Sequence, residues 1–332
     1  GRRGRRAVEW PRRDGPVDLT RLDRPADCTS MLGLPFPAAR LIPALAVPLA
    51  LVALMASPGI VAAPLSVRHP LVQSVDDHRA EYPVAVLRLA LEKAGVRADL
   101  RPAPVAMEQA RAMRSLAQGR LIDVMWTVST PERERRLRAV RIPIDRGLIG
   151  WRVLAVRRDA LPRFAGVRDV DDLARLVGAQ GHDWPDLAIL RSNGLDTVAT
   201  PSYSSLFELL ERGRIDYVAR GAGEALPELA SRADLGLVVE PRLVLHYPSA
   251  MYFFVHPDNE ALAAHLDRGL RRALADGSLD AAFERAYGAD LAALDLARRH
   301  RLTLANPQLP AQTPLAQAGG WYAPGDTARA RP

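Results

Sequence analysis

The chain of 332 residues is 48% hydrophobic and 25% charged, so it can bury a core and form more than one compact lobe. Its formal net charge is +7, but no basic run is interleaved with aromatic residues, which argues against nucleic-acid binding. Cys28 is the single cysteine and the seven histidines show no HxxxH or HxH spacing. Composition therefore predicts neither an intramolecular disulfide nor a metal site, and we expect no cofactor.

Residues 31–63 have the three parts of a secretory signal peptide. Arg40 is the only charged residue between Met31 and Ala63. The apolar run that follows it ends in small residues. An uncleaved membrane anchor is the alternative, because about 20 apolar residues can span a bilayer. Three prolines and a glycine interrupt the run. We therefore expect cleavage after Ala62 or Ala63 and a periplasmic location.

Residues 1–30 precede this expected signal peptide, although a signal normally stands at the very start of a protein. We expect Met31 to be the initiator and residues 1–30 to be an upstream, non-native segment. No cysteine follows the apolar run, so lipid attachment is not expected.

From Pro64 onward, short apolar runs alternate with helical patterns. The run PLSVRH predicts a strand, and YPVAVLRLALEKAGV predicts a helix that stops at Gly95. The segment MEQARAMRSLAQG predicts a second helix, ended by Gly119, and LIDVMW predicts the next strand. Strands that alternate with helices indicate parallel sheets with right-handed crossovers.

The same pattern recurs in the second half of the chain. LAQGRLIDVMW and LERGRIDYVAR share a helix, a glycine suited to a left-handed cap, an arginine, and an aspartate at the head of a strand. We therefore predict two similar α/β lobes. The apolar segments GLIGWRVLAVRRD and SAMYFFVHPDN are long enough to cross between them. Lobe 1 would comprise 64–152 and 251–332, with a C-terminal strap from about residue 301, and lobe 2 would comprise 153–250.

Two lobes of this kind place a ligand site in the cleft between them. In open parallel sheets, ligands bind beyond the carboxyl ends of the strands. With two hinge strands, those ends face each other across a cleft that can close on a small solute.

The stretch MWTVSTPERERRL lies at such a strand end. Thr130 is a suitable N-cap and Pro131 a suitable first helical residue. Arg133 falls in the first turn, where a cation is unfavourable against the helix dipole unless an anion is held there. The alternative is a solvated face in which the arginines pair with Glu132 and Glu134. The position on the predicted cleft favours an anion at Arg133.

The segment GRLIDVMWTVSTPERERRLRAVRIPIDRGLIG resembles bacterial extracellular solute-binding proteins of family 3, and NEALAAHLDRGLRRALADGSLDAAFERAYG is similar to their final helices. The resemblance covers residues 64 to 288. It implies an α/β, two-lobed, periplasmic-binding-protein-like fold of type II, with two parallel-type sheets joined by two hinge strands. It also implies that Arg133 clamps the α-carboxylate of a ligand, with Thr130 beside it.

The second lobe departs from the family pattern at the ammonium partner. Amino-acid binders of the family place an aspartate shortly after the strand that here reads GRIDYVARGAGE, and the matching position is Gly221. Arg220 and Glu224 flank it. Glu224 replaces the missing acid, or Arg220 and Glu224 simply form an i,i+4 ion pair; the sequence leaves both open.

Other residues are placed on the cleft by the same segments. Asp183 precedes Trp184-Pro185, which reads as a helix start facing the cleft. Trp126 and Thr127 close the strand before Arg133, and Tyr82 is a further candidate for the pocket wall. Aromatic residues at strand ends are as often packing residues.

We therefore expect a monomeric, non-enzymatic solute-binding protein that captures a small carboxylate-bearing solute, an amino acid or a related compound, for an ABC-type transporter. The partner would be a membrane permease or a sensor. One alternative is a ligand-sensing or degenerate non-transport protein. Another is a secreted dehydratase-like enzyme with Glu224 or Asp183 as its acid, although no nucleophile-base pair or metal triad stands in the sequence.

Overall fold

The computed structural model describes residues 63–71, 78–316 and 320–325. The segment 1–30 and the expected signal peptide up to residue 62 lie outside these ranges. Across the three described ranges, no helix is both long enough and apolar enough to cross a membrane.

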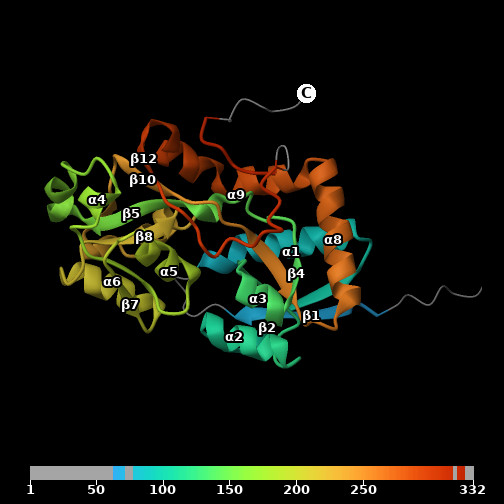
Figure 1. Cartoon of the computed structure of the whole chain (residues 1–332). Helices are drawn as coiled ribbons and strands as arrows, with labels where there is room; N and C mark the ends of the chain where they lie inside the picture. The colour runs from blue at the N-terminus through green and yellow to red at the C-terminus, as the bar shows by residue number, and fades with distance from the viewer. Residues whose placement is uncertain (1–62, 72–77, 317–319, 326–332) are drawn as a thin grey trace, which may run out of the picture. The chain divides into compact units, whose positions relative to one another are not determined.

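The first lobe is built on two small sheets with helices packed around them (Figure 1). Strands β1 and β2 pair in parallel, while β11 lies between β3 and β4 and is antiparallel to both. The elements of this lobe are β1 (Leu65–Leu71), η2 (His78–Ala80), α1 (Glu81–Lys93), β2 (Ala98–Ala106), α2 (Gln109–Ala117), β3 (Val124–Val128), α3 (Pro131–Arg136), β4 (Arg138–Val140), η3 (Leu148–Gly150), β11 (Met251–Val255), α8 (Glu260–Ala275), α9 (Ser278–Leu294) and η6 (Leu296–Arg298).

The second lobe is built on a mixed sheet with the order β12-β10-β5-β8-β6-β7, and β9 also pairs with β5. Its elements are β5 (Trp151–Arg157), η4 (Arg158–Phe164), α4 (Val170–Leu173), β6 (Gly178–Gly181), α5 (Pro185–Ser192), β7 (Thr197–Thr200), α6 (Tyr203–Glu211), β8 (Tyr217–Gly221), α7 (Ala225–Ala230), η5 (Ala233–Leu235), β9 (Leu237–Val239), β10 (Leu243–His246) and β12 (His300–Thr303).

The sheets are not purely parallel, although the sequence pattern predicted parallel-type sheets. In the second lobe β6 is parallel to β7 and β8, but β5 is antiparallel to β8, β9 and β10. The strands that carry the chain between lobes explain the difference, because β5 and β11 enter their sheets against the direction of the repeated strands.

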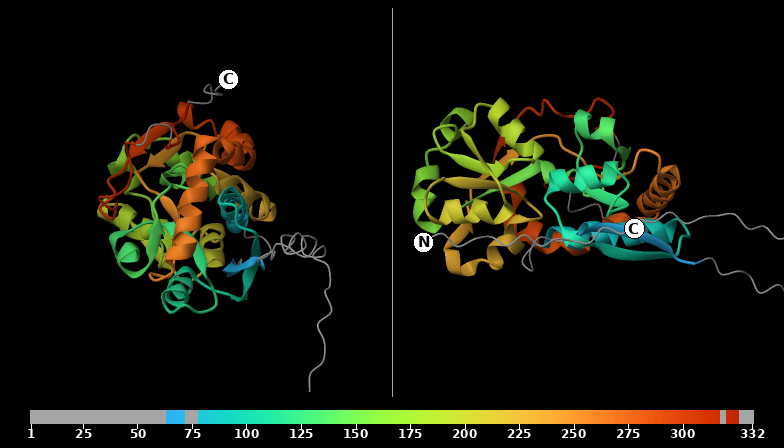
Figure 2. Two further views of the ribbon diagram at one scale, coloured as in Figure 1. Left: turned by 90° about the vertical axis from the view of Figure 1, so that its right-hand side faces the viewer. Right: turned by 90° about the horizontal axis from the view of Figure 1, so that it is seen from below.

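Helix α1 shows why the predicted helical pattern holds in the first lobe. Its buried residues recur at helical spacing and include Val86, Leu87 and Leu91, which join a core with α8 and α9. Full burial of such a side chain contributes about 1.5–3 kcal/mol. Gly269 lets α8 approach α1 closely, because a Cβ there would lie 1.7 Å from the Ala90 carbonyl oxygen. Figure 2 shows α8, in orange, beside α1, in cyan.

The repeated motif has the same local structure in both lobes. The backbone N–H of Asp123 donates to the carbonyl of Arg68, whose own N–H donates back to the Asp123 carboxylate at 2.8 Å. Asp216 makes the same exchange with Val177 in the second lobe. Gly119 and Gly213, which precede the aspartates, have φ of +64° and +63°. The expected left-handed glycine caps are confirmed, and each aspartate ties its strand to a neighbouring strand.

The hinge between the lobes contains a pair of aromatic side chains in contact, with their ring planes tilted by 32°. His246, at the end of β10, lies opposite Trp151, at the start of β5, with ring centroids 4.0 Å apart. Burial, helped by the nearby Arg301 charge, lowers the pKa of His246 to about 4. The neutral imidazole is therefore the form that this packing favours.

Replacing His246 with glutamine should flatten the pH dependence of stability between pH 6.5 and 4. Because the folded-state pKa is depressed, the unfolded chain binds a proton first as the pH falls, and the folded state loses stability through this window. Urea unfolding at several pH values measures the effect. Equal slopes for the wild type and the His246→Gln variant would contradict it.

The C-terminal segment connects both lobes. Leu291, Leu294 and Leu296 are buried in the first-lobe core, as expected. Strand β12, however, pairs in parallel with β10 of the second lobe, although residues 251–332 were assigned to lobe 1. The chain then returns to the first lobe, where the Tyr322 N–H donates to the Arg146 carbonyl (Figure 1, red).

Candidate functional site

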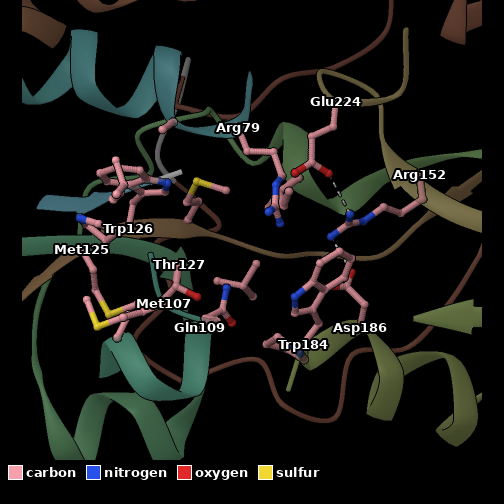
Figure 3. A pocket seen from close by; sticks show the side chains of 18 residues that line it. Arg79, Met107, Gln109, Met125, Trp126, Thr127, Arg152, Trp184, Asp186 and Glu224 are labelled. Carbon is pink, nitrogen blue, oxygen red and sulfur yellow. Dashed lines mark hydrogen bonds and ion pairs between the residues drawn. The ribbon is translucent and has the colours of Figure 1, made fainter. Parts of the chain in front are cut away.

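A pocket with a volume of about 150 Å³ lies between the two lobes. Trp126 and Thr127 of β3 line it from the first lobe, and Trp184 and Glu224 line it from the second (Figure 3). The structure thus brings together four residues that the sequence placed on the cleft. Tyr82, the further candidate, lines an adjoining cavity instead.

Glu224 supplies the carboxylate on the second-lobe side of the pocket. Its Oε2 atom lies 3.1 Å from the backbone nitrogen of Gly221, which donates to it. A Cβ at Gly221 would lie 2.6 Å from the same Oε2 atom, so the carboxylate uses the space that a side chain at 221 would need. The unusual glycine and the glutamate three residues later are therefore parts of one arrangement.

Glu224 forms ion pairs with two buried arginines. Its carboxylate lies 3.5 Å from Arg152 Nη1 and 3.1 Å from Arg220 Nη2. Burial alone would raise the pKa of Glu224, but the Arg220, Arg152 and Arg79 charges outweigh it and lower the pKa. Glu224 is therefore ionised at neutral pH, and its ion pair with Arg220 joins a strand to the start of a helix rather than two turns of one helix.

Arg152 also pairs with Asp186. The Arg152 Nη2 atom lies 2.5 Å from the Asp186 carboxylate, and both side chains are buried. The Tyr247 hydroxyl donates to Asp186 and accepts a hydrogen bond from Arg152 Nε at 3.0 Å. Arg152 and Asp186 line the pocket, so the second lobe presents a buried arginine–aspartate ion pair there.

Arg220 is not among the residues that line the pocket. Its guanidinium makes two hydrogen bonds of 2.6 Å to the Glu228 carboxylate, and both side chains are almost fully buried. The guanidinium also lies over the Trp184 ring, 4.9 Å from its centroid. Arg220 therefore supports Glu224 and Trp184.

Arg133 and Thr130 form the helix start that the sequence predicted. The Thr130 hydroxyl accepts the Arg133 N–H at 3.2 Å and Pro131 is the first residue of α3. The Arg133 guanidinium is buried and donates to Thr127 Oγ1, Gln109 Oε1, the Val128 carbonyl at 2.9 Å and the Asp183 carbonyl at 3.0 Å. Burial lowers its pKa to about 10, against the Asp183 and Asp186 charges.

The Arg133 guanidinium therefore lies behind two residues that line the pocket. It donates to Thr127 and Gln109, so the Thr127 hydroxyl proton and the Gln109 amide N–H groups remain as donors. Direct contact between Arg133 and a ligand would require Gln109 to move. The clamp role of Arg133 stays a prediction.

Asp183 links the two lobes. Its carboxylate accepts the Ala110 N–H at the start of α2 at 2.7 Å, and its carbonyl accepts from Arg133. Asp183, Arg133 and Thr130 line a third cavity, of about 590 Å³, next to the pocket. These hydrogen bonds join the two lobes across the cleft.

Among the side chains that line the pocket, four charged or amide groups were not predicted from the sequence. Arg79 approaches Glu224 in Figure 3, with its guanidinium 5.7 Å from the Trp184 ring centroid. Arg152 lies among apolar residues of β5, which otherwise carries a charge only at its last residue, Arg157, and this isolated charge was the available signal. Gln109 and Asp186 carried no comparable signal.

In the described part of the chain, no three His, Cys, Asp or Glu side chains gather to hold a metal ion.

Solved structures share this fold. An ancestral arginine-binding protein bound to arginine is 16% identical, with a TM-score of 0.52, over 68% of this chain and 99% of its own. A periplasmic His/Glu/Gln/Arg/opine family-binding protein from Silicibacter pomeroyi, in complex with lysine, is 13% identical, with a TM-score of 0.51, over 68% of this chain and 98% of its own. A histidine kinase sensor domain with similarity to periplasmic binding proteins is 19% identical, with a TM-score of 0.50, over 68% of this chain and 96% of its own.

No model of a protein family matches the sequence, and no curated protein matches it. The structural likeness nevertheless establishes the fold. The chain has the two-lobed α/β fold of periplasmic binding proteins, and the fold class expected from its resemblance to family 3 is confirmed.

Proposed function

We propose that the protein is an extracytoplasmic solute-binding protein that captures a small amino- and carboxylate-bearing solute between its two lobes. The observation that carries this proposal is the interlobe pocket, which has an ionised carboxylate, Glu224, on one side and hydrogen-bond donors on the other. Structural neighbours that bind amino acids in the same fold support it.

Glu224 would pair with the ammonium group of the solute. Its side chain is 20% exposed, whereas the side chains of its ion-pair partners Arg152 and Arg220 are 2% and 1% exposed. An ammonium in the pocket would complete the coordination of this carboxylate with a charge-assisted hydrogen bond.

The carboxylate of the solute would bind on the first-lobe side. Thr127 and Gln109 offer an O–H and an amide N–H group, and Arg79 offers a positive charge beside the pocket. Arg133 would act through Thr127 and Gln109, because its donated hydrogen bonds fix the orientation of both, and through direct contact if Gln109 moves aside.

Closure would follow from contacts that the solute makes to both lobes. A ligand shifts the open–closed equilibrium only by its differential affinity for the two states. Asp183 already joins the lobes through hydrogen bonds from Ala110 and Arg133, so the ligand would add to existing contacts across the cleft.

The bound solute would pass to an ABC-type permease, with the protein in the periplasm. Signal sensing is the second candidate, favoured by the likeness to a histidine kinase sensor domain. General-acid catalysis by Glu224 is disfavoured, because its lowered pKa keeps the carboxylate ionised at neutral pH.

A thermal-shift screen of the purified protein against amino acids and organic acids tests the proposal. One chemical class should raise the melting temperature, since a ligand that binds only the folded state stabilises it. Thr127→Val should weaken binding of the best ligand about tenfold. Thr197→Val, a buried threonine of the second-lobe sheet, is the matched control and should leave affinity unchanged. No stabilisation by any compound would refute the proposal.

A further inference from the structure

The interlobe pocket adjoins a larger cavity, here called the α9 cavity. It has a volume of about 570 Å³ and shares Arg79, Ile149, Glu224 and Met251 with the pocket. Glu224 thus faces both spaces, so a molecule held at Glu224 lies at the boundary of the α9 cavity.

Aromatic side chains form one flank of the α9 cavity. The Tyr82 ring of α1 and the Tyr287 ring of α9 lie 4.7 Å apart, centroid to centroid, at an angle of 51°. The Tyr82 hydroxyl is fixed by donating to the Ile144 carbonyl. Such a flank suits an alkyl chain and can also attract a cation to a ring face.

Acidic side chains outnumber basic ones in the lining of the α9 cavity, and two of these acids, Glu224 and Glu228, are paired with Arg220 behind the lining. Two arginines, Arg79 and Arg285, line it together with five acids: Glu81, Asp145, Glu224, Glu228 and Asp290. Among the described residues, the Asp290 carboxylate has no hydrogen-bond or ion-pair partner, and burial raises its pKa. A cation beside this carboxylate would form a charge-assisted hydrogen bond and offset its partial desolvation.

We propose that the α9 cavity receives the far end of the bound solute, and that this end is a cation. The ligand would be a carboxylate-bearing compound with an amine or guanidinium on an extended chain, and α9 would form part of its binding wall. This inference rests on the proposed function, because it assumes that Glu224 holds the near end in the pocket. The chain would lie along Tyr82 and Tyr287 and end near Asp290.

Calorimetric titration with lysine and norleucine tests the proposal, because norleucine has a chain of similar length without the terminal amine. The wild type should bind lysine at least about tenfold more tightly than norleucine. Asp290→Asn should reduce that preference at least about threefold without weakening norleucine binding. Glu284→Gln, an exposed position on the same helix that does not line the cavity, is the matched control and should keep the preference.

The outcomes separate the two proposals. Equal affinity for lysine and norleucine, or an unchanged preference in Asp290→Asn, would overturn the inference and leave the proposed function standing. If neither amino acid binds and no other compound stabilises the protein, the proposed function fails and the inference fails with it.

Discussion

Replacing Arg220 with methionine should lower the free energy of unfolding by about 3–5 kcal/mol. The Arg220 side chain is 1% exposed and holds Glu228, which is 2% exposed, through two short hydrogen bonds. Its removal leaves the Glu228 charge buried without a compensating cation and takes one partner from Glu224. The loss arises from this desolvated charge more than from the ion pair itself.

Two variants distinguish this cause from a general effect of losing an arginine. Arg271→Met breaks an exposed i,i+4 pair with Asp267 and should cost no more than about 1 kcal/mol. The double variant Arg220→Met/Glu228→Leu removes both buried charges and should recover much of the lost stability. Urea unfolding measures all three. A loss in Arg220→Met no larger than that in Arg271→Met would contradict the prediction.

Replacing Glu224 with glutamine should weaken binding of an amino-bearing solute about 100-fold. The substitution keeps the shape of the side chain but removes the charge that would pair with the ammonium. It also leaves Arg152 and Arg220 with one fewer anion each, so folding stability must be measured alongside affinity.

An acid of the second lobe away from the cleft is the appropriate control for Glu224→Gln. Glu208 lies exposed on α6 and does not line the pocket. Glu208→Gln should therefore leave affinity unchanged in the same titration. Equal weakening in both variants would indicate a general electrostatic effect rather than a contact at Glu224.

Local sequence patterns predicted the parts of the fold that local physics determines. The glycine caps at Gly119 and Gly213 and the N-cap at Thr130 depend on a few neighbouring residues, and all three are present. The repeated aspartates, Asp123 and Asp216, indicated two related lobes because each stands at the head of a strand.

The buried charges of the site could not be predicted in the same way. Arg152, Asp186 and Tyr247 meet from three segments that are far apart in the chain, so no spacing within one element reveals them. The relation between Gly221 and Glu224 was visible only as a departure from a family pattern, and the space that the glycine leaves open appears only in three dimensions.

Two further features depend on tertiary contacts. The direction of the Arg133 guanidinium is set by Gln109 and by the carbonyl of Asp183 in the opposite lobe, and neither contact is local. Strand β12 joins the second-lobe sheet because β10 offers it a free edge, a pairing across more than fifty residues of chain.

The central claim is that Glu224 recognises the ammonium group of a solute held between the lobes. Its most direct test is calorimetric titration of the wild type and Glu224→Gln with an amino acid that binds and with its analogue lacking the amino group. The wild type should bind the amino acid at least about tenfold more tightly than the analogue, and Glu224→Gln should bind the two almost equally. An unchanged preference in Glu224→Gln would contradict the claim.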